Sequence, residues 1–310
     1  MDVINRVADL IDELAMKVYD DYVANNNKIS YLESLTIALE FINGEDYKYS
    51  DKSLIETYKL LSDIKINEED LRKALFFEEI KAFKHLNLSL DAITPDAVCM
   101  IIACIMKRFK NMNVLDLGIG LGNLSVILKH YLDVDFNLIG IEQSEVLCNY
   151  LKAKANFLQI PMEIHFQDTL DMNYQNIDAI IADVDNYQYE NEYYSSALYD
   201  LGVRDYDYLL IEKHLDSGNP DALSYYIVES DFFSRCDSKT FREVFIKKAY
   251  FKAIITLPTS FNKNKQKIIL VVKKKKENEN VSTTVFNIPE IKNNKDINKL
   301  LINIRNTMES

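Results

Sequence analysis

The sequence predicts an α/β protein in which a mostly parallel β-sheet, covered by helices, follows an α-helical N-terminal domain. Two observations support this prediction. Residues 1–90 contain no proline and a single glycine, Gly44, and their apolar residues recur at helical spacing. From about residue 91 of the 310-residue chain, short β-branched and apolar runs alternate with helical patterns. Such alternation is typical of parallel strands that are joined by crossover helices.

The N-terminal segment is expected to form about four helices. Ile4, Val7, Ile11 and Leu14 repeat at helical spacing in the first of them, and three later segments carry comparable patterns. No residue in this part suggests chemistry. We therefore expect a helical module for recognition or dimerisation, which makes a protein partner or a homodimer its predicted use.

The rest of the chain is expected to supply seven strands. They are the runs NVLDLG, NLIGIE, MEIHFQD, IDAIIAD, LSYYIVES, KAIITLP and QKIILVVKK. The link between the last two runs is too short for a crossover helix, so these strands should pair antiparallel. The polar stretch 277–283 then predicts a linker, followed by a short extended piece and a closing helix. We expect this tail to dock on the body of the protein, for example on the N-terminal helices.

Composition excludes several classes of protein. A formal charge of −12 opposes tight, sequence-independent binding to nucleic acid. The longest apolar run, 97–106, is about half of the roughly 20 residues that a membrane helix needs. The N-terminus mixes acidic and apolar residues, unlike a secretory signal. The four cysteines are scattered without metal-ligand spacing, which predicts buried free thiols and no metal site. We expect a soluble, cytoplasmic protein with no membrane association.

Three of the seven glycines fall within five positions, at Gly118, Gly120 and Gly122. They follow a predicted strand that ends near Asp116, and a predicted helix begins near Asn123. Glycines let the backbone turn sharply after a strand and let a ligand approach the main chain closely. The N-terminus of the following helix offers unpaired N–H groups. One glycine would serve the turn alone, so three of them predict ligand binding.

Two further acids end the next predicted strands, Glu142 after NLIGIE and Asp168 after IHFQD. The carboxyl ends of parallel strands meet at one edge of a sheet, where ligands bind. A dinucleotide fingerprint fits poorly, because Asn123 stands where its last glycine belongs and Asp116 would repel a pyrophosphate. Glu142 suits the ribose of any nucleotide. An NAD-linked oxidoreductase is therefore only the third candidate function.

The segment DLGIGLG resembles the first motif of class I S-adenosylmethionine (SAM) methyltransferases, D-x-G-x-G-x-G. The resemblance implies a Rossmann-like, seven-stranded methyltransferase sheet with an antiparallel last strand, and SAM as the cofactor. It places the acid at the end of the first strand against the amino group of SAM, the second acid against the ribose and the third against adenine. The residues that it assigns to cofactor binding are Thr94, Asp116, Gly118, Gly120, Gly122, Asn123, Glu142, Gln143, Asp168, Thr169 and Asp183.

The segment just before that motif, LDAITPDAV, reads as a helix start, with Thr94 as a candidate cap and Pro95 in the first turn. A T-P-x-x-V helix at this place resembles the extra SAM motif of N(6)-adenine DNA methyltransferases and of type I restriction modification subunits. The likeness covers residues 91–276 and is strongest to the YtxK-like family of stand-alone bacterial proteins. It implies an α-helical domain at 1–90, a methyltransferase domain at 91–276 and a C-terminal tail at 277–310.

The acceptor motif of that lineage, [DNS]-P-P-[YFW], falls on the fourth strand end. Asp183 matches its first place, but Val184 and Asp185 replace the prolines and Tyr187 comes one residue late. The resemblance implies that Asp183 orients a target amino group and that Tyr187 stacks on a flipped base. The stretch 178–207 is rich in acids and tyrosines, with Arg204 as its one cation. It is either an aromatic lid over a substrate or an exposed loop.

The leading hypothesis is SAM-dependent methyl transfer to a nitrogen, in a lineage of adenine-specific DNA methylation, with Asp183 and Tyr187 as catalytic residues. The alternative is a catalytically inactive SAM- or nucleotide-binding module that acts through protein partners. Only about 35 residues follow the catalytic domain, so no target-recognition region for reading base edges is expected there. Nucleic acid is therefore a weakly supported partner.

Overall fold

The computed structural model describes residues 3–45, 52–108, 111–132, 134–261, 265–276, 279–290 and 294–309. The chain divides into two units. The smaller comprises residues 1–93 and 144–164, and the larger comprises 94–143 and 165–310. The segment 144–164 begins after one strand of the sheet and ends within the next, so the larger unit is interrupted along the chain by a piece of the smaller one.

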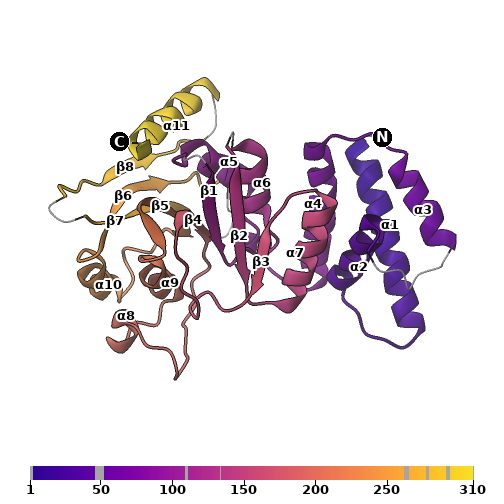
Figure 1. Ribbon diagram of the computed structural model, residues 1–310, viewed down its shortest axis with the longest axis horizontal. Helices are drawn as coiled ribbons and strands as arrows, with labels where there is room; N and C mark the ends of the chain where they lie inside the picture. Colours follow the sequence, from indigo (N-terminus) through magenta and orange to yellow (C-terminus); the bar gives the residue numbers. More distant parts are fainter. Residues whose placement is uncertain are drawn as a thin grey trace. The chain divides into compact units, whose positions relative to one another are not determined.

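The smaller unit is helical, as expected (Figure 1). Its α-helices are α1 (Val3–Ala24), α2 (Tyr31–Asn43), α3 (Lys52–Ser62), α4 (Glu68–His85) and α7 (Glu145–Phe157), with a short 3₁₀ turn at Leu90–Ala92. α1 packs against α2, α3 and α4, and α2 also packs against α7. Helix α2 has both of its ends capped: Ser30 and Glu33 form a capping box, and Gly44 closes the C-terminus with φ 81°. The four predicted N-terminal helices are confirmed.

The larger unit is built on a sheet of eight strands in the order β3-β2-β1-β4-β5-β7-β6-β8. The strands are β1 (Met112–Leu117), β2 (Phe136–Glu142), β3 (Glu163–Phe166), β4 (Ile177–Asp183), β5 (Gly218–Glu229), β6 (Ala249–Thr256), β7 (Lys267–Lys274) and β8 (Thr284–Asn287). β1 pairs parallel with β2 and β4, and β4 pairs parallel with β5. β7 lies between β5 and β6 and is antiparallel to both. The predicted antiparallel pair is therefore confirmed.

The tail adds more to this unit than the sequence predicted. The short extended piece becomes β8, an eighth strand that pairs parallel with β6 at the sheet edge. The closing helix, α11 (Asn294–Glu309), packs against α5 (Asp96–Ile105) within the larger unit. Leu301, Ile304 and Met308 are buried on α11. Of the predicted linker 277–283, residues 277 and 278 lie outside the described part of the chain.

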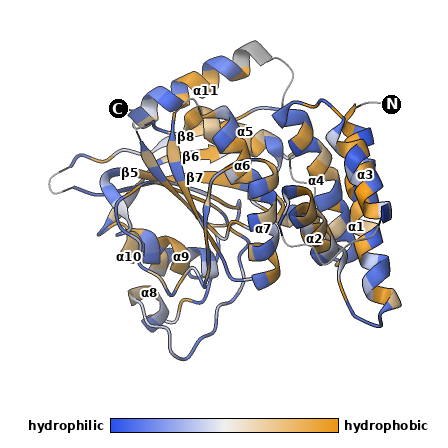
Figure 2. Ribbon diagram, turned by 45° about the vertical axis from the view of Figure 1, so that its right-hand side comes forward, coloured by the Kyte–Doolittle hydropathy of each residue, from blue (hydrophilic) through white to orange (hydrophobic). Residues whose placement is uncertain are grey.

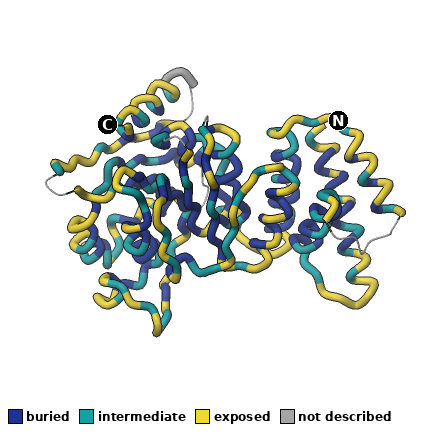
Figure 3. The backbone as a smooth tube through the Cα atoms, in the orientation of Figure 1, coloured by how far each residue is buried: buried dark blue, intermediate teal, exposed yellow. Residues whose placement is uncertain are grey.

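The central strands are apolar and buried along most of their length (Figures 2 and 3). In β4, Ile180, Ile181 and Ala182 are all buried, because a parallel strand covered on both faces has no solvent side. This explains why these strands appear in the sequence as continuous apolar runs. The remaining helices of the larger unit are α6 (Asn123–Tyr131), α8 (Ala197–Asp200), α9 (Tyr206–His214) and α10 (Ser238–Phe245).

The composition led to expectations about the cysteines and about membrane-spanning helices. All four cysteines carry thiols that form no disulfide, but only Cys99 and Cys148 are buried, whereas Cys104 and Cys236 are exposed. The expectation of four buried thiols is therefore wrong for two of them, because scattered cysteines carry no information about which face of an element they occupy. Among the residues that the structure describes, no helix is both long enough and apolar enough to cross a membrane.

Candidate functional site

The loop between β1 and α6 carries the glycine cluster. Gly118, Gly120 and Gly122 have φ values of 72°, 57° and 74°, in the left-handed region that side chains with a Cβ rarely adopt. A Cβ added at Gly118 would meet no atom within 4 Å, so this residue borders open space. The three glycines are therefore required by the backbone conformation, and one of them leaves room beside the main chain.

A fourth glycine, which was not predicted to belong to the site, leaves space in the neighbouring strand for a side chain of this loop. Gly140 lies in β2, and a Cβ there would come within 2.5 Å of Cδ1 of Ile119, the residue between the first two loop glycines. Gly140 thus makes room for the side chain that anchors the loop on the sheet. Only the sheet register, which pairs β1 with β2, reveals this role.

Asp116 lies at the end of β1 and is 2% exposed. Its Oδ2 accepts a hydrogen bond from the Ser125 hydroxyl at 2.5 Å. Burial raises the pKa of the Asp116 carboxyl to about 7; the Ser125 bond opposes this shift, and the nearby carboxylates of Asp183 and Glu142 add to it. Three acidic side chains from three strand ends therefore act on one another at this edge of the sheet.

Glu142, at the end of β2, is buried and accepts a hydrogen bond from the Gly120 amide at 3.0 Å. Its carboxylate thus connects the second strand end to the glycine loop. Asn123, the first residue of α6, donates from Nδ2 to the Thr94 carbonyl at 2.7 Å and to Asp96 Oδ1 at 3.0 Å. Gln143 is exposed beside Glu142. The sequence-predicted residues of this part of the site therefore do lie around one loop.

Thr94 does not cap α5, so that part of the prediction is wrong. Helix α5 begins at Asp96, and its N-cap residue Pro95 makes no side-chain hydrogen bond. The Thr94 hydroxyl instead donates to Asp183 Oδ2 at 2.7 Å. Thr94 precedes the N-cap position by one residue, so its hydroxyl is not placed to cap the helix. It donates instead to a largely buried carboxylate, which is a strong acceptor for a hydroxyl.

Asp168 and Thr169 follow β3. The Asp168 Oδ1 accepts from the Leu170 amide at 2.9 Å, and the Thr169 hydroxyl lies 2.5 Å from the Tyr206 hydroxyl. The Thr169 carbonyl lies 2.8 Å from Nε2 of His214, a buried histidine that the sequence analysis did not single out. Burial lowers the pKa of His214 to about 4, so its imidazole is neutral. Nε2 must then carry the proton, because a carbonyl can only accept.

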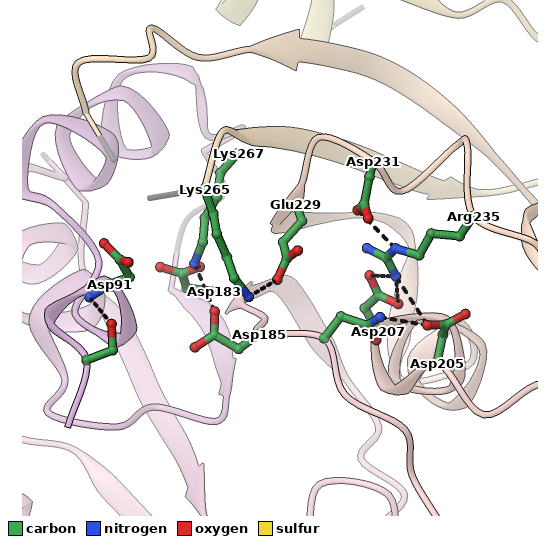
Figure 4. A network of polar contacts seen from close by, with 12 residues as sticks. Asp91, Asp183, Asp185, Asp205, Asp207, Glu229, Asp231, Arg235, Lys265 and Lys267 are labelled. Carbon is green, nitrogen blue, oxygen red and sulfur yellow. Dashed lines mark hydrogen bonds and ion pairs between the residues drawn. The ribbon is translucent and has the colours of Figure 1, made fainter. Parts of the chain in front are cut away.

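Asp183, at the end of β4, is held on both of its oxygens. Its Oδ1 accepts from the ammonium group of Lys267 at 2.6 Å (Figure 4). Its Oδ2 accepts from the Thr94 hydroxyl. The Lys267 side chain is 2% exposed. Burial acts to lower the pKa of Lys267, but Asp183 and Asp185 outweigh it and the pKa lies above its usual value. The carboxylate expected to face an acceptor therefore forms a buried ion pair in this structure.

Lys267 reaches this place because of the antiparallel strand. β7 runs opposite to β4 and β5, so its first residue lies at the edge where those two strands end, with Lys267 in register with Glu229. Asp185, two residues beyond Asp183, is half exposed and lies 3.4 Å from the same ammonium group. Without the prolines, the backbone after β4 is held by the Val184 amide, which donates to the Ile227 carbonyl at 2.9 Å.

The tyrosines after β4 divide into two groups. Tyr187 is 44% exposed and stacks on Tyr206 with ring centroids 4.5 Å apart. Tyr189 is buried, and Tyr194 and Tyr199 pack edge-on against it. Tyr193, in contrast, is 89% exposed. The rings therefore lie in different environments, and only Tyr187 combines exposure with a position next to the strand end.

Four acids of this stretch pair with cations from elsewhere in the chain: Asp183 and Asp185 with Lys267, and Asp205 and Asp207 with Arg235. Asp207 is buried and accepts from Arg235 with both oxygens at 2.8 Å (Figure 4). Asp205 accepts from Asn186 at 2.6 Å, which closes the loop on itself. Part of this run of acids is therefore compensated by cations that the sequence places far away. The sequence held one local sign of such a cation at the site: Lys267 is a charged residue that directly precedes the buried strand segment IILVV.

The sheet order, the glycine loop after β1 and the acids at successive strand ends define the fold of class I SAM-dependent methyltransferases. A comparison with solved structures agrees. A protein from Listeria monocytogenes, described as a candidate class I SAM-dependent methyltransferase, superposes with a TM-score of 0.82 over 99% of both chains at 20% identity. The methyltransferase subunit of a type I restriction-modification system from Streptococcus thermophilus has a TM-score of 0.65, over 96% of this chain and 74% of that one, at 16% identity.

Among curated proteins, the chain is similar to YtxK of Bacillus subtilis (strain 168), an uncharacterized protein. The two are 26% identical over 275 residues, which is 84% of this chain and 82% of that protein. No family model matches the sequence. The likeness to methyltransferases is therefore a likeness of fold.

Proposed function

We propose that this chain binds SAM at the glycine loop and transfers its methyl group to an acceptor. The observation that carries the proposal is the gathering of Asp116, Glu142 and Asp183 at the loop, close enough for the other two to raise the pKa of Asp116. Carboxylates crowded in this way favour a cationic ligand, although Lys267 already offsets the charge of Asp183, so Asp116 and Glu142 contribute most of this preference at the loop. SAM carries a sulfonium and an ammonium group, whereas the phosphates of NAD would add negative charge to the same place.

The residues at the loop fit this cofactor. Open space beside Gly118 leaves room for a ligand against the main chain. Glu142 is a carboxylate at the second strand end, of the type that accepts from ribose hydroxyls, and Asp168 with Thr169 would border adenine. SAM supplies an already activated methyl group, so the protein is required mainly to position the acceptor.

The acceptor proposed here is a nitrogen, in keeping with the likeness of Asp183 and Tyr187 to the motif of adenine methyltransferases. Tyr187 is exposed and supported by Tyr206, which suits stacking on a planar base.

The charge distribution gives little support to nucleic acid as the substrate. Three of the lysines in the run 273–276 pair with acids, Lys273 with Glu279, Lys274 with Asp216 and Lys276 with Asp221. These pairs leave less of that run for phosphates.

Calorimetric titration with SAM, and with NAD as the control ligand, tests the proposal. Asp116→Ala should weaken SAM binding by more than tenfold, because it removes a carboxylate at the loop. Asp171→Ala is the matched control, since Asp171 is an exposed acid three residues after Asp168. Failure of the wild-type protein to bind SAM after any co-purified ligand has been removed would contradict the proposal.

A second candidate function is SAM binding without methyl transfer. The ion pair between Lys267 and Asp183 favours it, because the carboxylate that should orient the acceptor already accepts two hydrogen bonds. Transfer of a labelled methyl group from SAM to unmethylated DNA, RNA and protein fractions distinguishes the two. Label that is transferred by the wild type and lost in Asp183→Ala supports the enzyme; SAM binding with no transfer to any fraction supports the module, which would act through a partner of its helical unit.

A further inference from the structure

Lys267 is a buried cation with no place in the sequence-predicted site. Its side chain is 2% exposed, and its ammonium group donates to Asp183 at 2.6 Å and lies 3.4 Å from Asp185. A lysine is almost never buried so completely unless it is paired. The pairing here costs the site its acceptor-facing carboxylate, so the residue calls for an explanation beyond strand stability.

A chain of hydrogen bonds links Lys267 to the glycine loop. Lys267 donates to Asp183, the Thr94 hydroxyl donates to the other oxygen of Asp183, and Asn123 of α6 donates to the Thr94 carbonyl at 2.7 Å. Asp183 is also close enough to act electrostatically on Asp116. The charge of the Lys267–Asp183 pair therefore affects the electrostatic potential at Asp116, where β1 ends and the glycine loop begins.

We infer that Lys267 is a specificity-determining residue of the cofactor pocket: paired with Asp183, its charge sets how strongly the pocket prefers cationic SAM to the neutral product S-adenosylhomocysteine (SAH). This inference rests on the proposed binding of SAM. With the pair intact, its net charge is zero, and the preference for the sulfonium comes from Asp116, Glu142 and Asp185. With Asp183 neutralised, Lys267 presents a positive charge that opposes the sulfonium and leaves SAH almost unaffected.

SAM and SAH differ only in the methyl group and the charge of the sulfur. Their affinity ratio cancels every contact that the two ligands share, including the amino group, ribose and adenine. The ratio therefore reports the electrostatic field at the sulfur, which a merely structural role of Lys267 would not move. At pH 8.5, Asp116 is ionised, because its pKa is about 7, so its titration does not enter the comparison.

The experiment is a double-mutant cycle in which SAM and SAH are each titrated by calorimetry at pH 8.5. Asp183→Asn should lower the SAM:SAH affinity ratio by about tenfold or more, because the charge of Lys267 is then uncompensated by Asp183 in a site with little solvent to screen it. Asp185, at 3.4 Å, helps to keep the ammonium group protonated in this variant. Adding Lys267→Met should restore most of the ratio, because two uncharged side chains then replace an ion pair whose net charge is also zero.

Lys265→Met is the matched control. Lys265 lies two residues away, is about half exposed, and pairs with Glu229 instead of Asp183. Its removal should change the ratio by less than about threefold. If Asp183→Asn does not fold, Lys267→Met alone decides, because removing the cation should raise the ratio by about threefold or more.

Different outcomes contradict the proposed binding of SAM and the proposed role of Lys267. If the wild type binds neither SAM nor SAH, the proposed function is wrong. If it binds both, but Asp183→Asn weakens them equally or the double variant fails to recover the ratio, the role of Lys267 is wrong and the SAM site stands.

Discussion

Individual residues of the candidate site hold ionisable groups where water is excluded, and burial favours the neutral form of each. The Asp116 carboxyl has its pKa raised to about 7, and the His214 imidazole has its pKa lowered to about 4. An acid and a base respond to burial in opposite directions, so they make opposite contributions to the pH dependence of stability. Single substitutions of Asp116 and His214 therefore measure the two contributions separately.

Asp116→Asn should stabilise the protein increasingly as the pH rises. Between about pH 4 and 7 the native state holds a proton on Asp116 that the unfolded state has released, so the free energy of unfolding of the wild type falls with rising pH. Asparagine does not titrate, and its oxygen still accepts from Ser125. The relative gain should reach the order of 4 kcal/mol at pH 8. Urea denaturation at pH 5, 6.5 and 8 measures it, and a difference independent of pH would exclude this origin.

His214→Gln should show the reverse pattern. The native state keeps His214 neutral down to about pH 4, whereas the unfolded state takes up a proton near pH 6.5, so stability is lost as the pH falls through this window. From pH 7 to 5 the wild type should lose about 2 kcal/mol relative to the variant. His130→Gln is the control, because His130 is exposed. Equal pH profiles of all three proteins in urea denaturation would refute the assignment.

At the scale of elements, the site depends on where strands end. β1, β2 and β4 are parallel neighbours, so their carboxyl ends bring Asp116, Glu142 and Asp183 together. β7 is antiparallel, so its beginning brings Lys267 to the same edge. The loop after β1 completes the site because its glycines hold left-handed conformations that leave the main chain accessible.

Gly118→Ala tests that loop against a glycine of the same geometry outside it. Gly118 and Gly202 have φ values of 72° and 91°, and a Cβ would meet nothing within 4 Å at either. Both alanine variants should therefore lose about 1–2 kcal/mol of stability from backbone strain alone. Only Gly118→Ala should also weaken SAM binding, by about tenfold or more, because its methyl group occupies the space next to the loop. Thermal unfolding measures the loss of stability and calorimetry measures the SAM affinity. Equal SAM affinities of the two variants would show that SAM does not occupy the space beside Gly118.

On the scale of the whole molecule, the two units are interleaved along the chain. The chain leaves the larger unit directly after Glu142 and Gln143, forms α7 in the smaller unit, and returns just before Asp168. α7 is fixed in the smaller unit by Lys154, whose ammonium group lies 2.5 Å from Glu79 of α4, with Tyr150 donating to the same oxygen at 2.6 Å. The two acids proposed for ribose and adenine thus flank a helix that belongs to the N-terminal bundle.

Lys154→Met should destabilise the protein by about 3–5 kcal/mol, because it leaves Glu79 charged and unpaired in a site where both side chains are at most 2% exposed. Pairing it with Glu79→Leu should recover most of this loss, since a buried ion pair can be replaced by apolar residues of similar size. Urea denaturation of the single and double variants measures the effect. A double variant as unstable as the single one would mean that Tyr150, and not the ion pair, determines the packing of α7.

The sequence by itself determined the features that depend on near neighbours. Helical spacing identified the N-terminal helices, alternation of strands and helices identified the sheet, and the glycines with the acids Asp116, Glu142 and Asp168 identified the edge of the sheet where we propose that SAM binds. Each of these signals arises within a few residues of chain, because backbone geometry and strand length are local properties.

Only the tertiary structure decided what each charge faces. Lys267 pairs with Asp183 across 84 residues and Arg235 with Asp207 across 28, because β7 inserts between β5 and β6 and an arginine after β5 turns back on α9. The same is true of α7, whose amphipathic pattern shows that it is a helix but not which helices it packs against. Desolvation and Coulomb interactions act through space, so the partner of a buried charge is determined by the arrangement of the strands and not by the residues beside it in the chain.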